Sequence, residues 1–194
     1  MIIGLTGGIA AGKSTVCGMF QSLGIPVHDS DRAVHDLLSP KGAATAKIAR
    51  AFPDTRLAQG GIDRAALGRL VFSDKASLAR LETILHPLVQ KEQARFLRDC
   101  RRKGHRMAVL DIPLLFESHS QDRVHHVLCA HAPMEIRHRR ALRRPGMTPQ
   151  KLAAIQARQW SDARRIKASD AVLSTHEGRA KTLRELKRLV SLWG

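Results

Sequence analysis

The sequence predicts an α/β fold in which a mainly parallel sheet is covered by helices on both faces. Three observations support this expectation. Short apolar runs alternate with segments of helical period along much of the 194-residue chain. A glycine-rich loop separates the first apolar run from the first helical segment. Hydrophobic residues make up 43% of the chain, which is enough for the packed core of one domain.

The N-terminal elements can be placed one by one. Residues 1–5 are apolar and run into Thr6-Gly7-Gly8, which is typical of a buried strand entering a glycine loop. Apolar side chains recur at helical spacing over residues 13–23, and Gly24 ends that helix. Residues 25–28 predict a second strand, after which Asp29-Ser30-Asp31 offers cap residues for a helix towards Leu38.

The middle of the chain lacks the alternation of strands. Helices are expected at residues 43–52, 64–72 and 76–102, the last interrupted at His86-Pro87 because proline disfavours helix interiors. Together, residues 40–104 predict a helical insertion in an otherwise alternating chain. The remaining expected elements are strands at 107–112, 124–130 and 171–174 and helices at 133–143, from 148 onwards and at 177–192.

Composition and charge restrict the class of protein. No apolar run approaches the ~20 residues of a membrane span, and the N-terminus lacks the basic segment and cleavage site of a signal peptide. The 3 cysteines have no metal-type spacing, so we expect a soluble cytoplasmic protein without a disulfide scaffold. The net charge is +16, of which residues 91–194 contribute +13, and this predicts a polyanionic partner rich in phosphate.

The strongest motif is Gly7-Gly8-Ile9-Ala10-Ala11-Gly12-Lys13-Ser14, a full match to G-x-x-x-x-G-K-[ST]. It follows a strand and opens a helix, as phosphate binding by backbone N–H groups at a helix N-terminus requires. Lys13 is expected to reach the β- and γ-phosphates and the Ser14 hydroxyl to bind Mg²⁺. The motif predicts that the chain binds a nucleoside triphosphate.

Three aspartates follow expected strands. Asp29 and Asp31 end the second strand, where either is a candidate base for an acceptor hydroxyl and either is a candidate helix N-cap. If the segment is extended, their spacing by two points both side chains the same way. Asp111 ends the apolar strand 107–111, which favours a carboxylate that orders Mg²⁺ or its waters, although a plain strand-ending aspartate remains the alternative.

Two arginine-rich runs and 10 histidines remain. Arg140 and Arg144 share one helix face by their i, i+4 spacing, and guanidinium groups there would stabilise charge on a transferring phosphoryl group. Most arginines of that run, and the second run at residues 95–106, are expected to be solvated. No histidine pattern has the spacing of a zinc site.

Taken together, these motifs resemble the dephospho-CoA kinase family, a group of P-loop kinases. The resemblance covers nearly the whole chain, and its most selective parts are L-E-x-I-x-H-P and D-x-P-L-L-x-E. The matching segments are Gly4–Ile9 with Gly12-Lys13-Ser14, Val27–Asp31, Ile62–Arg64 with Leu67 and Val71-Phe72, Leu81–Pro87, Asp111–Glu117, and Arg140, Arg144, Gln159 and Ser169-Asp170.

The resemblance implies a P-loop NTPase fold with three α/β/α layers and a five-stranded parallel sheet in the order 2-3-1-4-5. It implies transfer of the γ-phosphoryl group of MgATP to the ribose 3′-hydroxyl of dephospho-CoA, which gives coenzyme A and ADP. Residues 40–104 would bind the CoA part, and residues 137–160 would form a lid.

Roles for single residues follow from the same resemblance. Asp31 would be the general base, and Lys13 and Arg140 the other catalytic groups. Residues around the phosphates and the acceptor are also implied: Gly8, Ile9, Ala10, Ala11, Gly12, Lys13, Ser14, Thr15 and Arg144 for the nucleotide; Asp31, Arg64, His86, Pro113, Leu114 and Glu117 for the substrate; Ser14 and Asp111 for Mg²⁺.

The sequence departs from the family at a few positions. Ala10 and Ala11 replace loop glycines, and Thr175 replaces an asparagine near the final strand. Two other classes of protein are alternatives. One is a P-loop kinase of nucleosides or shikimate, and the other is a nucleic-acid-binding NTPase, for which 194 residues leave no room for motor elements. We expect small-molecule substrates rather than nucleic acid or membrane, and a monomer or weak homo-oligomer.

Overall fold

The sheet of this computed structural model has five strands in the order β2-β3-β1-β4-β5. The structure describes all 194 residues except the side chains of Phe72 and Ser73, so the Phe72 position of the family motif lies outside the described side chains. The strands are β1 (Ile2–Thr6), β2 (Val27–Asp29), β3 (Ala108–Asp111), β4 (His126–His131) and β5 (Ala171–Ser174). The expected order 2-3-1-4-5 is confirmed, and β1 pairs in parallel with both β3 and β4.

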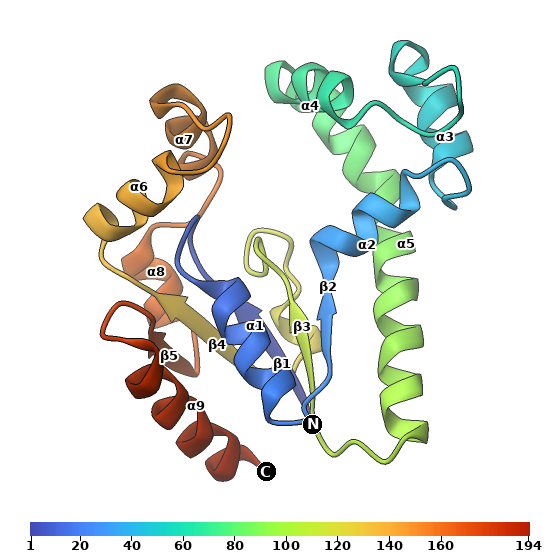
Figure 1. Cartoon of the computed structure of the whole chain (residues 1–194). Coiled ribbons are helices and arrows are strands. Elements are labelled where there is room, and N and C mark those ends of the chain that lie inside the picture. The colour runs from blue at the N-terminus through green and yellow to red at the C-terminus, as the bar shows by residue number, and fades with distance from the viewer. The chain divides into compact units, whose positions relative to one another are not determined.

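Helices connect most of the successive strands, as the alternating pattern predicts, whereas only a short 3-10 turn lies between β3 and β4 (Figure 1). The longer helices are α1 (Lys13–Ser22), α2 (Ser30–Leu37), α3 (Thr45–Ala51), α4 (Arg64–Ser73), α5 (Lys75–Arg102), α6 (Met134–Leu142), α7 (Pro149–Gln156), α8 (Asp162–Lys167) and α9 (Arg179–Trp193). Two 3-10 turns, η1 (Pro53–Thr55) and η2 (Gln121–Arg123), complete the elements. None of the described helices combines the length and the apolar character needed to cross a bilayer.

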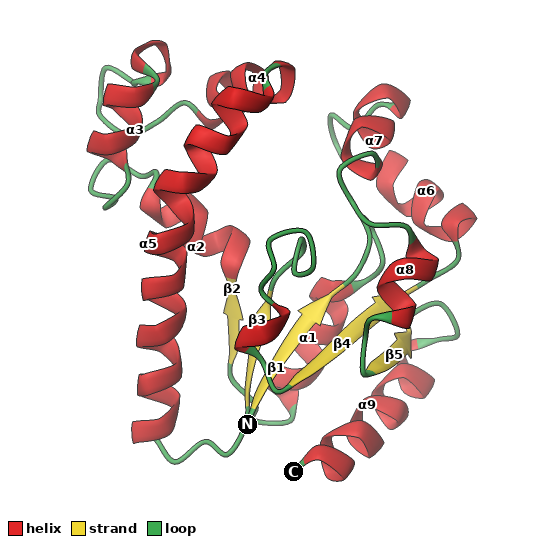
Figure 2. Ribbon diagram, turned by 180° about the vertical axis from the view of Figure 1, so that it is seen from behind, coloured by secondary structure: helices red, strands yellow, loops and turns green.

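The chain folds as two compact units. The first, called here the sheet unit, comprises Met1–His28 and Cys100–Gly194, and the second, the helical unit, comprises Asp29–Asp99. Figure 2 shows that the regular structure of the helical unit is almost entirely helix, whereas β1, β3, β4 and β5 all belong to the sheet unit.

The core of the sheet unit lies between the sheet and two helices, α1 and α9. Fully buried Ile3 and Leu128 from the strands pack with Phe20 of α1 and Leu186 of α9. On the other face, a Cβ added at Gly4 would meet Leu115 at 2.6 Å and Val124 at 3.1 Å. The segment after β3 therefore covers β1 closely, which only a residue without a side chain allows.

The helical unit has its own core, built from α2, α3, α4 and α5. Ile48, Leu67, Leu81 and Leu85 are among its buried members. Asp63 caps α4 by accepting hydrogen bonds from the N–H groups of Ala65 and Ala66, and these bonds lower the pKa of its carboxyl group.

Two expectations about helices were wrong. The break at His86-Pro87 does not occur, because α5 continues through Pro87. Proline removes one N–H from the helix, but buried Leu81 and Leu85 and partly buried Leu88 pack α5 against the core on both sides of it. In the sheet unit, α8 was not anticipated, since its six residues are too few to show a helical period.

The end of β2 also differs from the expectation. The chain is extended only as far as Asp29, and α2 begins at Ser30. The carboxylate of Asp29 accepts a hydrogen bond from the Arg32 N–H at 2.9 Å and so acts as the N-cap. Asp31 lies in the first turn of α2, so the extended segment on which the argument from spacing depended does not reach it.

Candidate active site

The glycine-rich loop connects β1 to α1 in the sheet unit. Its turn is closed by a hydrogen bond from the Ala11 N–H to the Gly8 carbonyl at 3.0 Å. Gly12 has a φ of 93°, which glycine adopts without steric cost, and α1 begins at the next residue. The loop thus leads directly into a helix N-terminus, the arrangement that binds phosphate through backbone N–H groups.

The alanines at the third and fourth variable positions of this loop, Ala10 and Ala11, have different backbone conformations. Ala10 has a φ of 58°, a left-handed conformation that is uncommon outside glycine. Its side chain is 7% exposed and packs with Ala141 of α6 and Leu152 of α7. Ala11 is 2% exposed and has no such backbone requirement. The methyl of Ala10 therefore gains apolar contacts that offset part of the backbone strain.

Lys13 and Asp111 lie together at the carboxyl ends of neighbouring strands. The Lys13 Nζ is 3.7 Å from Asp111 Oδ1, and the Cys17 Sγ is 3.5 Å from Asp111 Oδ2. Strand pairing explains this proximity, because Leu5 of β1 stands opposite Asp111 of β3. Ser14, the next residue of α1, is exposed.

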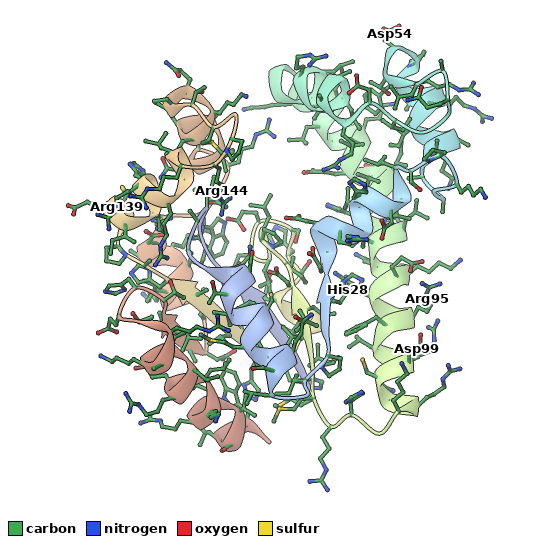
Figure 3. All side chains as sticks on the ribbon, viewed as in Figure 1. His28, Asp54, Arg95, Asp99, Arg139 and Arg144 are labelled. Carbon is green, nitrogen blue, oxygen red and sulfur yellow. The ribbon has the colours of Figure 1, made fainter. Side chains whose placement is uncertain are left out.

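Two segments distant in sequence form hydrogen bonds with the loop. The Ile9 N–H donates to Gln159 Oε1 at 2.9 Å, and the Thr175 hydroxyl donates to the Ala11 carbonyl at 2.6 Å. Arg140 of α6 donates from Nη2 to the Thr175 carbonyl at 3.0 Å and from Nη1 to its hydroxyl at 3.4 Å. Arg140 is thus engaged with the segment after β5, whereas Arg144 is exposed beyond the end of α6 (Figure 3).

Beneath the loop lies a buried ionic cluster that sequence analysis missed. Arg137 and Arg165 are 3% and 2% exposed, and both form ion pairs with Asp162. A Cβ at Gly8 would overlap the Arg137 guanidinium and come within 3.4 Å of Arg165. The sequence predicts that most arginines of residues 137–144 are solvated, and Arg137 is an exception. The i, i+3 spacing of Asp162 and Arg165 was the local pattern that could have indicated an ion pair.

The same cluster affects two titratable groups on β4. Burial raises the pKa of the Cys129 thiol to about 11, and the nearby Arg165 charge opposes this shift only in part. Burial also lowers the pKa of His131, against the opposing influence of Asp162. Both residues are therefore held in their neutral forms near neutral pH.

Glu117, Pro113 and Leu114, all expected at the acceptor site, follow β3 in the sheet unit. Glu117 Oε1 accepts a hydrogen bond from the Trp160 N–H at 2.6 Å and lies 3.8 Å from Arg165 Nη2. The Pro113 carbonyl accepts from the Thr6 hydroxyl at 3.1 Å, and Leu114 is 38% exposed. The ring of Trp160 stacks on Phe116 with a 4.9 Å centroid separation.

In the helical unit, Asp31 lines a cavity of about 440 Å³. Asp29, Arg32, His35 and Arg64 form the rest of its lining, and an Arg64 Nη1 contacts His35 Nδ1. The structure thus brings two expected acceptor-site residues, Asp31 and Arg64, to one cavity. His86, the third such residue of the helical unit, is an exposed residue of α5 and is not part of this lining.

The second basic run is solvated where α5 ends. Arg95 is 68% exposed and pairs with Glu92 of the same helix, and Figure 3 shows it pointing outward from α5. No three described side chains of the types that bind metals as a group, His, Cys, Asp or Glu, gather in one place.

Comparison with known proteins gives a consistent result. The family model described as dephospho-CoA kinase matches residues 1–181. A dephospho-CoA kinase from Rhodospirillum rubrum is 46% identical over 187 residues, which are 96% of this chain and 89% of that protein.

Solved structures support the same fold. A crystal structure of TT1252 from Thermus thermophilus superimposes with a TM-score of 0.86 at 33% identity, covering 100% of this chain and 98% of that one. Dephospho-CoA kinase from Campylobacter jejuni has a TM-score of 0.71 at 23% identity, with 98% and 95% of the two chains covered.

Proposed function

This chain belongs to the dephospho-CoA kinase family, whose members use ATP to phosphorylate dephospho-CoA in the final step of coenzyme A biosynthesis. We propose a role for each of its site residues in that reaction. The observation that carries the proposal is the glycine-rich loop between β1 and α1, with Lys13 Nζ 3.7 Å from Asp111. In this scheme the sheet unit binds ATP, and the γ-phosphoryl group passes to the ribose 3′-hydroxyl of dephospho-CoA.

The nucleotide phosphates bind to the loop from Gly8 to Thr15. Backbone N–H groups of the loop and the N-terminus of α1 supply partial positive charge, and Lys13 adds a full charge at the β- and γ-phosphates. Arg140 and Arg144 act from residues 137–160, the proposed lid. Arg140 uses two of its five N–H donors on Thr175, so it retains donors for a phosphoryl oxygen.

The residues present fit a magnesium ion. Ser14 offers a hydroxyl oxygen and Asp111 a carboxylate, and Mg²⁺ is usually held by one or two protein oxygens together with substrate phosphates. When bound, the ion would neutralise charge on the β- and γ-phosphates. Asp111 would hold the ion or its waters, and until then it orients Lys13.

The acceptor is assigned to the helical unit and to the segment after β3. Residues 40–104 would bind most of dephospho-CoA, and Arg64 would contact one of its phosphate groups from the cavity that it shares with Asp31. His86, Pro113, Leu114 and Glu117 would shape the rest of the acceptor site. Asp31 would accept the proton of the 3′-hydroxyl as that oxygen attacks the γ-phosphorus.

Asp31→Asn tests the reaction and the base together, with ADP release followed in the presence of MgATP and dephospho-CoA. The unchanged protein should turn over only when dephospho-CoA is present, and Asp31→Asn should lower kcat by about 10²-fold or more. Asp36→Asn is the matched control, because Asp36 is an exposed carboxylate of the same helix that pairs with Arg32. Turnover with another hydroxyl acceptor but none with dephospho-CoA would refute the assignment of dephospho-CoA as the substrate. Equal rates for Asp31→Asn and Asp36→Asn would refute the assignment of Asp31 as the base.

We also propose that the protein acts in the cytoplasm, as a monomer or weak homo-oligomer, with small-molecule substrates alone. None of its three cysteines, all of which lie among the described residues, forms a disulfide, which suits a reducing compartment. Part of the positive charge is explained by two substrates that both carry several phosphate negative charges.

A further inference from the structure

Thr175 contacts the glycine-rich loop from a segment that no motif connects with phosphate binding. Its hydroxyl oxygen lies 2.6 Å from the Ala11 carbonyl oxygen and 3.1 Å from the His131 carbonyl oxygen. A hydroxyl has one proton, and the His131 carbonyl already accepts the Thr175 N–H at 2.9 Å. The proton therefore goes to Ala11, the shorter contact.

Arg140 strengthens this contact. Its Nη1 donates to the Thr175 hydroxyl at 3.4 Å, and its Nη2 donates to the Thr175 carbonyl at 3.0 Å. A hydroxyl that accepts a hydrogen bond from a cation is polarised and becomes a better donor to its own acceptor. Two contacts also fix Thr175 to α6, so the hydroxyl is held in place before any nucleotide arrives.

The shape of the loop fits the same side chain. A Cβ at Gly12 would come within 2.9 Å of the Thr175 hydroxyl oxygen and 3.0 Å of its Cβ. The Thr175 side chain thus packs on the bare Cα of Gly12 while its hydroxyl bonds to the preceding carbonyl. Thr175 therefore contacts both residues of the Ala11–Gly12 peptide, directly before α1 begins.

The orientation of this peptide has a direct consequence. The Ala11–Gly12 bond is trans and planar, so its C=O and N–H point in opposite directions. Because Thr175 holds the carbonyl, the Gly12 N–H points away from Thr175. Among the described residues that N–H has no hydrogen-bond acceptor, and it lies one residue before the helix N-terminus that binds anions.

We propose that Thr175 is a positioning residue for ATP: it fixes the Ala11 carbonyl so that the Gly12 N–H is directed at a phosphate of the nucleotide. This rests on the proposed function, in which the loop binds the phosphates of ATP. It adds a residue from the segment after β5 to that site. The role depends on the hydroxyl, which serine shares and which valine, of nearly the same shape, lacks.

Thr175→Val and Thr175→Ser test the role, with Thr182→Val as the matched control. Thr182 is a buried residue of the sheet unit, and its hydroxyl donates to the Ser174 carbonyl at 2.7 Å, but it does not touch the loop. Thr175→Val should raise KM for ATP about tenfold, with kcat within about threefold of the unchanged protein. Thr175→Ser should have the KM for ATP of the unchanged protein. Thr182→Val should also keep that KM, even if its melting temperature falls as much as that of Thr175→Val.

A second measurement separates phosphate positioning from contact with the base. The inhibition constants of inorganic tripolyphosphate and adenosine are measured against ATP. Thr175→Val should weaken the binding of tripolyphosphate by about the same factor as the binding of ATP, and the binding of adenosine should not change. Unchanged binding of tripolyphosphate, an unchanged KM for ATP, or an equal rise in Thr182→Val would each overturn the proposal.

Lys13→Met distinguishes this failure from failure of the proposed function. If Lys13→Met binds tripolyphosphate as tightly as the unchanged protein does, the phosphates do not bind at the loop and the proposed function fails with the inference. If Lys13→Met weakens tripolyphosphate and Thr175→Val does not, only the role of Thr175 is refuted.

Discussion

The ammonium group of Lys13 lies 3.7 Å from the carboxylate of Asp111, and the two side chains are only 17% and 13% exposed. The lysine is therefore already located at the loop by a carboxylate on the neighbouring strand. A charge that is placed in advance loses less entropy and needs less reorganisation when phosphate binds.

Lys13→Met should lower kcat by about 10² to 10³-fold, because it removes a charge directed at the transferring group and leaves the fold intact. Steady-state kinetics with saturating substrates measures the effect. Lys103→Met is the control, since Lys103 is an exposed lysine near the end of α5 and should keep full activity. A Lys13→Met protein with kcat within threefold of normal would contradict the assigned role.

Asp162→Ala should destabilise the sheet unit by about 3 kcal/mol, because it leaves the charges of Arg137 and Arg165 buried without their shared partner. For a chain of this size that corresponds to a fall in melting temperature of about 10 °C. Thermal unfolding followed by circular dichroism measures it. Asp122→Ala, in the short turn η2, should cost about 0.5 kcal/mol or less; equal shifts for both variants would contradict the role of the cluster.

Ala10→Gly should change the free energy of unfolding by less than about 1 kcal/mol. Relief of a left-handed alanine gains about 1 to 2 kcal/mol, whereas the lost buried methyl costs about 0.8 and the added chain entropy about 0.5 to 1. Ala10→Val should be strongly destabilising, because a β-branched residue rarely adopts a φ of 58°. Chemical denaturation of both variants tests this; a Val variant as stable as the Gly variant would refute the strain.

Iodoacetamide at pH 8 should alkylate Cys17 before Cys100 or Cys129. Cys17 is partly exposed, whereas the other two thiols are buried. A pKa of about 11 for Cys129 leaves about one thiolate in a thousand at pH 8, and only the thiolate reacts. Peptide mass mapping over time identifies the order, and early labelling of Cys129 would show that β4 is not buried in solution.

The fold was largely readable because its signals are local. The apolar run of β1, the helical spacing of α1 and the cap at Thr148 each depend on a few adjacent residues. Pro87 shows the limit of such signals. A proline penalty of a few kcal/mol argues for a break, but the packing of Leu81 and Leu85 outweighs it.

In the candidate site, too, local features could be predicted from the sequence and contacts between distant segments could not. The motif predicted a phosphate-binding loop that ends at Ser14, because phosphate binding needs consecutive backbone N–H groups. Asp29 and Asp31 were equivalent by spacing alone, and the family resemblance favoured Asp31 as the base. Only the structure shows that α2 begins at Ser30 and that Asp29 is its N-cap. The contacts of Gln159 and Thr175 with the loop cross about 150 residues of chain, so no local pattern records them.

The sequence by itself determined most of the strands and helices, the glycine-rich loop between the first strand and the first helix, and the family to which the chain belongs. Those features depend on neighbouring residues or on motifs of fixed spacing. Only the tertiary structure decided that Arg137 is a buried ion-pair partner while Arg144, seven residues later, is exposed. The physical reason is that an arginine carries the same charge at any position in the sequence. Whether it is buried with an ion-pair partner or left in water depends on which groups the fold brings next to it.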